Sequence, residues 1–189
     1  MVFELAASLR RLKPEKRTPP LVRRPDDELT FADDAQAGGP PLLLDTTVYI
    51  DVLQNRAPQA VKDLLLVRQV NHSSIAVGEL THLFGRLDPS HHDTGDVLTA
   101  VRGVIEDIPR HRLFAPSVAA VAEAGIVTGV VARLRGLPKA DRQPFMNDAT
   151  LLLQALENGS TLLSRNIGDM DLIQQIVPAG RVLLYRQRR

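Results

Sequence analysis

Four acidic residues stand where apolar segments of the chain begin or end. Asp45 directly follows the leucine run 42–44. The other three, each beside apolar residues rather than inside a charged run, are Glu79, Asp148 and Asp169. Carboxylates that meet within a few ångströms raise one another's pKa, so a cluster of them needs a cation. Mg²⁺ and Mn²⁺ suit such oxygen ligands and assist attack on phosphates, so the pattern predicts metal-dependent phosphodiester hydrolysis.

Two further acids lie close to these in sequence. Asp51 is six residues after Asp45, and its spacing favours a supporting or exposed helix position over a metal ligand. Asp171 is two residues after Asp169, so either could supply the fourth carboxylate, and we favour Asp169. A single acid at a strand end or helix start is most often a cap or turn residue. The prediction therefore depends on the four positions together.

Short apolar runs that alternate with helical patterns must position these acids. The strands expected are 42–44, 70–75, 112–115, 161–163 and 181–185, and the helices expected are 48–54, 58–67, 77–87, 94–108, 117–135, 144–157 and 169–176. This alternation predicts a three-layer α/β/α fold with a mostly parallel central sheet. Ligands bind such sheets at the carboxyl ends of the strands, where Asp45, Asn166 and Asp169 fall. Asp148 is expected at the amino end of its helix, where the helix dipole favours an anion.

Composition limits the classes of protein that fit. A length of 189 residues with 44% hydrophobic content predicts one sizeable domain. The absence of cysteine excludes disulfides and thiolate metal sites, so a metal must be held by oxygen or imidazole. No apolar run approaches the length of a membrane span, and the start of the chain is not a secretory signal. We therefore expect a cytoplasmic protein.

The first 40 residues differ from the rest of the chain. The stretch 1–12 could form a short amphipathic helix, but the stretch that follows is charged, rich in proline and poor in periodic apolar residues. We interpret 1–40 as an N-terminal arm, partly extended or disordered, and 41–189 as the nuclease domain.

Four segments together resemble the PIN-domain family, and within it the VapC-like toxins of toxin–antitoxin pairs. They are DTTVYIDVL, SSIAVGELTHL, NDATLLLQALENGSTLLSRN and SRNIGDMD, and the resemblance runs from about Leu42 to Tyr185. It implies a PIN-like fold and a ribonuclease that depends on Mg²⁺ or Mn²⁺. It also implies a homodimer inhibited by a small antitoxin that binds DNA.

The resemblance assigns roles to individual residues. The acidic catalytic set is Asp45, Glu79, Asp148 and Asp169, of which Asp45, Asp148 and Asp169 hold the metal. The polar support is Thr46 and Asn166. Independently of the resemblance, Arg165 is a candidate for contact with substrate phosphates, because it lies between a strand and the fourth acid. Three departures from the family pattern are mild: Ser164 in place of threonine, Met170 in place of an aromatic residue, and Ala76 in place of a hydroxyl residue. The fourth is that the first 40 residues have no counterpart in the family, which leaves the role of the arm open.

Other functions fit less well or remain open. A phosphatase of the haloacid dehalogenase type needs a second aspartate where this chain has Thr47, and no P-loop motif is present. The basic run 133–142 could bind phosphates or could simply end a helix. The main alternative is a catalytically silent PIN-like module that binds RNA or a protein partner. A third possibility is that the arm carries the main role by wrapping a partner or a second copy of the chain.

Overall fold

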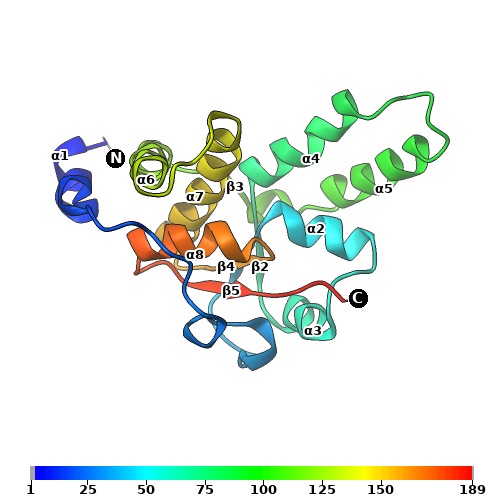
Figure 1. Cartoon of the computed structure of the whole chain (residues 1–189). Helices are drawn as coiled ribbons and strands as arrows, with labels where there is room; N and C mark the ends of the chain where they lie inside the picture. The colour runs from blue at the N-terminus through cyan, green and yellow to red at the C-terminus, as the bar shows by residue number, and fades with distance from the viewer. Residues whose placement is uncertain (1–2, 189) are drawn as a thin grey trace.

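Five parallel strands form one central sheet in the computed structural model, which describes residues 3–188 (Figure 1). The strands are β1 (Leu42–Leu44), β2 (Val70–Ser73), β3 (Leu113–Phe114), β4 (Thr161–Ser164) and β5 (Val182–Leu184), in the order β3-β2-β1-β4-β5. Every pair of neighbouring strands is parallel. The predicted strands are therefore all present.

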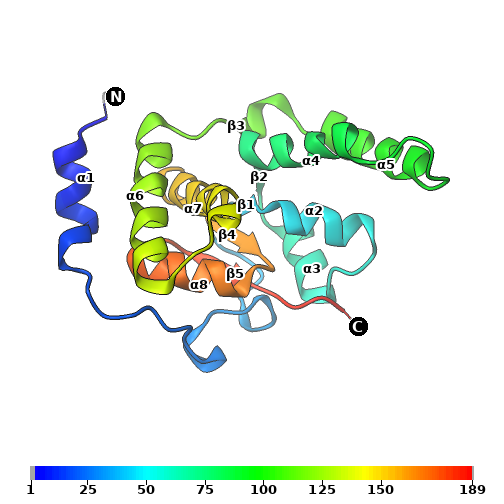
Figure 2. The ribbon, with the colours of Figure 1, turned by 45° about the horizontal axis from the view of Figure 1, so that its top comes forward.

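Helices cover both faces of this sheet. One layer contains α2 (Thr46–Leu53), α3 (Gln59–Val67), α4 (Ser74–Arg86) and α5 (Thr94–Glu106). The other contains α6 (Val118–Arg135), α7 (Arg142–Glu157) and α8 (Ile167–Ile176), as Figures 1 and 2 show. Side chains of the central strand alternate between the two cores: Leu43 packs with α6 to α8, and Leu42 and Leu44 pack with α2 to α5. The three-layer α/β/α prediction is confirmed.

The order of the strands reverses at β1. The chain places β2 and β3 on one side of β1 and then returns to place β4 and β5 on the other side. At this point the backbone N–H of Asp45 donates to the carbonyl of Leu163 at 3.1 Å, which sets the carboxyl ends of β1 and β4 side by side. Ligands bind open α/β sheets at such a reversal. The site is therefore expected beside Asp45.

Most element boundaries differ from the sequence prediction by one to three residues, and two of these differences have a clear local cause. β2 ends at Ser73, because the Ser73 hydroxyl accepts a hydrogen bond from the backbone of Ile75 at 3.1 Å and caps α4. α7 begins at Arg142, before Pro144, which is tolerated throughout a first turn and so does not mark the start of a helix. Asp148 therefore lies in the second turn of α7, and the prediction that it lies at the amino end was wrong.

The described part of the arm runs along α6, α8 and the edge of β5 (Figures 1 and 2). Its helix α1 (Leu5–Leu12) packs on α6, where the Ser8 hydroxyl donates to buried Glu123 at 2.6 Å. Further along, Phe31 pairs with Leu184 and extends the sheet beyond β5. Short 3₁₀ turns occupy Pro14–Lys16, Asp26–Glu28, Ala32–Asp34, Arg110–Arg112 and Lys139–Asp141. The arm is thus attached to the domain at several points.

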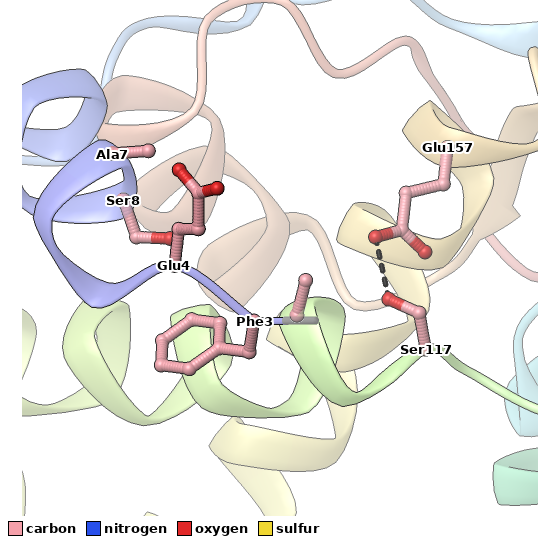
Figure 3. A pocket seen from close by; sticks show the side chains of 7 residues that line it. Phe3, Glu4, Ala7, Ser8, Ser117 and Glu157 are labelled. Carbon is pink, nitrogen blue, oxygen red and sulfur yellow. Dashed lines mark hydrogen bonds between the residues drawn. The ribbon is translucent and has the colours of Figure 1, made fainter. Parts of the chain in front are cut away.

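A hollow of about 620 Å³ lies between α1 and the facing ends of α6 and α7. Figure 3 shows Glu4, Ala7 and Ser8 on one side of it, and the hydrogen bond from Ser117 to Glu157 on the other. None of the four predicted acids lines this hollow. Across residues 3–188, no helix combines the length and hydrophobicity that crossing a membrane requires.

Candidate metal site

Asp45 caps α2 and is only 2% exposed. Its Oδ2 accepts hydrogen bonds from the hydroxyls of Thr47, at 2.8 Å, and of Ser164. Among residues 3–188, the one hydrogen-bond contact of its Oδ1 is long, 3.5 Å from the backbone nitrogen of Thr47. Burial raises the pKa of the Asp45 carboxyl, and the charge of Glu79 raises it further. One oxygen of this buried carboxylate is therefore left without a short hydrogen bond.

Asn166 connects Asp148 to Asp169. Its amide nitrogen donates to Asp148 Oδ2 at 2.7 Å and to Asp169 Oδ2 at 2.9 Å. Its amide oxygen accepts from the backbone nitrogen of Asp169 at 3.4 Å and so caps α8. Since Asn166 directly follows β4, it holds a carboxylate from α7 and one from α8 at the carboxyl end of the sheet.

Glu79 approaches from α4. Its carboxylate accepts hydrogen bonds from the hydroxyl of Thr46 and, at 2.7 Å, from the amide of Asn147. It also lines a groove of about 700 Å³ that runs between α4 and the start of α7 and includes His82 and Gln143. Of the four acids, Glu79 is the one that lines this groove.

The four acids influence one another electrostatically. Burial raises the pKa of Asp148 to about 9, with further contributions from the charges of Asp45, Asp169 and Glu79. Among residues 3–188, no arginine, lysine or histidine forms an ion pair with any of the four. The structure therefore brings together the four acids that the sequence predicted, without a protein cation to balance them.

The donor set fits a hard cation. Asp148 and Asp169, like Asp45, have an Oδ1 atom without a short hydrogen bond to the residues described. These are oxygen ligands of the kind that Mg²⁺ and Mn²⁺ prefer. Amides and hydroxyls lie between the carboxylates of the four acids, so three of their oxygens do not come within 4.8 Å of one another. Within residues 3–188, the exposed group His91, His92 and Asp93 is the one set of three possible metal ligands that does. The acid site would thus have to contract around a bound cation.

Asp51 and Asp171 point away from this cluster. Asp171 accepts from the backbone nitrogen of Arg24 at 2.9 Å and from its guanidinium at 2.6 Å, so it holds the arm. Asp51 is fully buried and lies 2.9 Å from Nε of Arg165. Of the two candidates for the fourth acid, Asp169 is the one that Asn166 connects to Asp148.

Two arginines of the basic run 133–142 contact the arm. Arg133 donates to the carbonyl of Pro14 at 2.9 Å, and Arg135 donates to the carbonyl of Leu21 at 3.4 Å. Arg142 donates to the carbonyl of Leu137 at 3.3 Å, close to the end of α6. These contacts favour a structural role for the run.

The sequence prediction missed three residues of the site. Thr47 and Ser164 bond to Asp45, and Asn147 bonds to Glu79. The position of Thr47 carried a usable signal, because a side chain two residues after a capping aspartate lies within reach of its carboxylate. Ser164 supplies a hydroxyl where the family pattern has threonine, so this departure preserves the contact.

Comparison with known proteins gives matches to structures only. No protein-family model matches the chain, and no curated protein matches it. Solved structures do match. One is VapBC2 from Rickettsia felis bound to a DNA fragment from its promoter, with a TM-score of 0.54, 14% identity, and coverage of 77% of this chain and 99% of that one. The chain has a PIN-like fold.

Two further structures have the same architecture. FitAcB from Neisseria gonorrhoeae matches with a TM-score of 0.53 and 20% identity, over 75% of this chain and 96% of that one. DNA-bound VapBC from Salmonella typhimurium matches with a TM-score of 0.53 and 20% identity, over 76% and 97%. At these identities the likeness establishes the PIN-like fold and leaves the chemistry to be argued from the site.

Proposed function

We propose that this protein is a metal-dependent endoribonuclease whose active site is formed by Asp45, Glu79, Asp148 and Asp169. The observation that supports this most is the balance of charge around the buried acids. The other fully buried carboxylates among residues 3–188 are Asp51, Glu123 and Asp171, and each lies against an arginine. Asp45 instead lies near other acids. Such an arrangement is costly unless a cation from outside the chain completes it.

The residues of the site have separate tasks in this proposal. Asp45, Asp148 and Asp169 would hold Mg²⁺ or Mn²⁺ through oxygens that have no short protein hydrogen bond. The bound cation would supply an activated water and charge stabilisation at the phosphate. Thr46 and Asn166 keep the carboxylates oriented by donating hydrogen bonds to Glu79, Asp148 and Asp169. Burial, and then the charges of Asp45, Asp169 and Glu79, raise the pKa of Asp148, so a bound cation would have to displace the proton that this pKa favours.

The biological setting is also part of the proposal. The fold is shared with VapBC and FitAcB structures, two of which are bound to DNA. Together with the motif resemblance, this supports a toxin that acts on RNA in the cytoplasm, forms a homodimer and is inhibited by a cognate antitoxin. The test is expression of the chain alone. The wild type should arrest growth, and the Asp148→Asn variant at equal abundance should not.

Cleavage assays test the activity directly. RNA and single-stranded DNA are incubated with the full chain and Mg²⁺ or Mn²⁺, with and without a chelator. Wild type should cut RNA only when metal is present, and Asp148→Asn should lose at least about 100-fold in rate. Asp96→Asn is the matched control, because it removes the same charge from an exposed position on α5.

Two results would count against the nuclease. Cleavage that survives both the chelator and Asp148→Asn would show that the acids are not the active site. RNA binding by wild type without any metal-dependent cleavage would favour the silent PIN-like module instead.

A further inference from the structure

Asp51 sits at the centre of a buried polar network behind the acid site. Its Oδ1 accepts from the amide of Gln187 at 2.6 Å, and its Oδ2 accepts from the hydroxyl of Tyr185 at 2.8 Å. The same Oδ2 lies 2.9 Å from Nε of Arg165. Tyr185 and Gln187 follow β5, so residues from α2, β4 and the end of the chain meet here. Within residues 3–188, the polar contacts of the Asp51 carboxylate therefore lie in this network and not with the four acids of the candidate site.

Arg165 connects this network to the acid site. Its backbone N–H donates to the Thr47 hydroxyl at 3.2 Å, and that hydroxyl donates to Asp45 at 2.8 Å. Thr47, Arg165 and Asn166 together line a small hollow of about 280 Å³. The Arg165 backbone is thus two hydrogen bonds from the most deeply buried of the four acids.

The guanidinium of Arg165 is anchored at one edge only. Nε is buried and within ion-pair distance of Asp51, but its N–H is not aligned for a hydrogen bond, so the attraction is between charges. The two terminal nitrogens donate to no residue in 3–188, although the side chain is only 36% exposed. This contrasts with Arg24, whose terminal nitrogen donates to Gln174 at 2.8 Å in addition to its bond to Asp171.

We propose that Arg165 binds a backbone phosphate of the RNA next to the scissile bond, and that Asp51 is the positioning residue that aims it. This proposal rests on the proposed function, because Arg165 would be the group that attracts the RNA substrate to an acidic site. Four clustered carboxylates repel a phosphate, and a guanidinium fork is the side chain best suited to bind one. Anchoring Nε to a buried carboxylate leaves both terminal N–H groups directed away from Asp51 and limits the rotamers that must be frozen on binding.

A binding measurement tests this without relying on turnover. RNA binding is measured for Asp148→Asn alone and for Asp148→Asn combined with Arg165→Gln, Arg165→Lys or Asp51→Asn, at several salt concentrations. Arg165→Gln should weaken binding about 10-fold and reduce the slope of log K against log salt by about 0.7, the value for one phosphate contact in a single strand. Arg165→Lys should recover part of the affinity, since it keeps the charge without the fork.

The role of Asp51 has a separate signature. Asp51→Asn should weaken RNA binding in the same direction as Arg165→Gln, and adding it to Arg165→Gln should cause almost no further loss, because its effect passes through Arg165. A purely structural Asp51 would give additive losses. In turnover assays, Arg165→Gln should raise KM about 10-fold with kcat nearly unchanged, as expected for uniform binding.

Arg102→Gln is the matched control, since Arg102 is exposed on α5. The inference is overturned if Arg165→Gln binds RNA with the same affinity and salt slope as Arg102→Gln. It is also overturned if the effects of Asp51→Asn and Arg165→Gln add. An absence of metal-dependent cleavage in the wild type would overturn the nuclease instead, and the binding data would still decide the role of Arg165.

Discussion

Buried carboxylates in this molecule fall into two groups that differ in the charge that faces them. The paired group is Asp51 with Arg165, Glu123 with Arg11, and Asp171 with Arg24. Asp45 is buried to a similar degree, but its charged neighbours are Glu79 and Asp148. A buried carboxylate that lacks a cation costs several kcal/mol, so a fold that keeps one needs another reason to keep it. Burial alone therefore does not distinguish the candidate metal site from the ion pairs, whereas burial without a protein cation does.

Helix α8 contains both an acid of the candidate site and an acid of the paired group. Asp169 lies in its first turn and accepts a hydrogen bond from Asn166, and Asp171, two residues on, is bound by Arg24 of the arm. Residues two apart on a helix point in different directions. The same short segment therefore contributes one acid to the candidate active site and one to the attachment of the arm.

The largest effect on stability is expected from removing the cation of a paired acid. Arg24→Ala leaves the Asp171 carboxylate, whose side chain is 0% exposed, without a cation. It should lower the free energy of unfolding by roughly 3–5 kcal/mol, measured by urea denaturation at pH 7. Arg23→Ala is the control next in sequence, because its ion pair with Asp26 is exposed and its loss should leave the free energy of unfolding nearly unchanged. Equal losses from the two variants would show that burial of the pair is unimportant.

Removing an acid from the cluster that lacks a protein cation should have the opposite effect and raise the free energy of unfolding. The pKa of Asp148 is about 9 in the folded protein and about 4 in an unfolded chain. The folded state therefore binds more protons between these pH values, so stability falls as pH rises through this window. In the presence of a chelator, Asp148→Asn should be more stable than wild type at pH 8, by about 2 kcal/mol or more, and close to wild type at pH 4.

Thermal unfolding at several pH values measures this difference. Asp96→Asn, on the exposed surface of α5, should follow the wild-type curve throughout. If Asp148→Asn is less stable than wild type at pH 8 without metal, the cluster is not electrostatically strained, and the distinction between the two groups of acids fails.

Much of the fold could be predicted from the sequence because its signals are local. The runs 42–44 and 161–163 are apolar and flanked by helical periodicity, so β1 and β4 were predicted within one residue. The strand-end position of Asp45 and its neighbourhood with Asn166 followed from the parallel topology. The same reasoning gave the three-layer arrangement.

What the sequence could not show is which charges meet. The Arg24–Asp171 pair joins residues 147 positions apart, and nothing in either local segment indicates the other. Asp51 looked like a helix residue near the site, and only the tertiary structure shows that Tyr185, Gln187 and Arg165 surround it. The helix start at Arg142 was also missed, because proline restricts the first turn without fixing its first residue.

The smallest effect on stability is expected where a buried acid loses a hydrogen-bond donor but keeps its arginine. Ser8→Ala removes the hydroxyl that donates to Glu123, but Arg11 still pairs with the same carboxylate. The free energy of unfolding should fall by about 1 kcal/mol, the usual contribution of one hydrogen bond. Ser90→Ala, whose hydroxyl donates to exposed Asp88, should leave the free energy of unfolding nearly unchanged. If Ser8→Ala lowered the free energy of unfolding by well more than Arg24→Ala does, the attachment of the arm would depend mainly on α1.

Calorimetric titration of Mn²⁺ into the metal-free full chain at pH 7.5 tests the central claim most directly. Wild type and the controls Asp96→Asn and His92→Ala should bind with similar affinity, His92→Ala excluding the exposed group His91, His92 and Asp93 as the main site. Asp148→Asn should bind at least about 10-fold more weakly, because one of the charged oxygen ligands is gone. Wild-type affinity in Asp148→Asn, or no binding by wild type, would contradict the account.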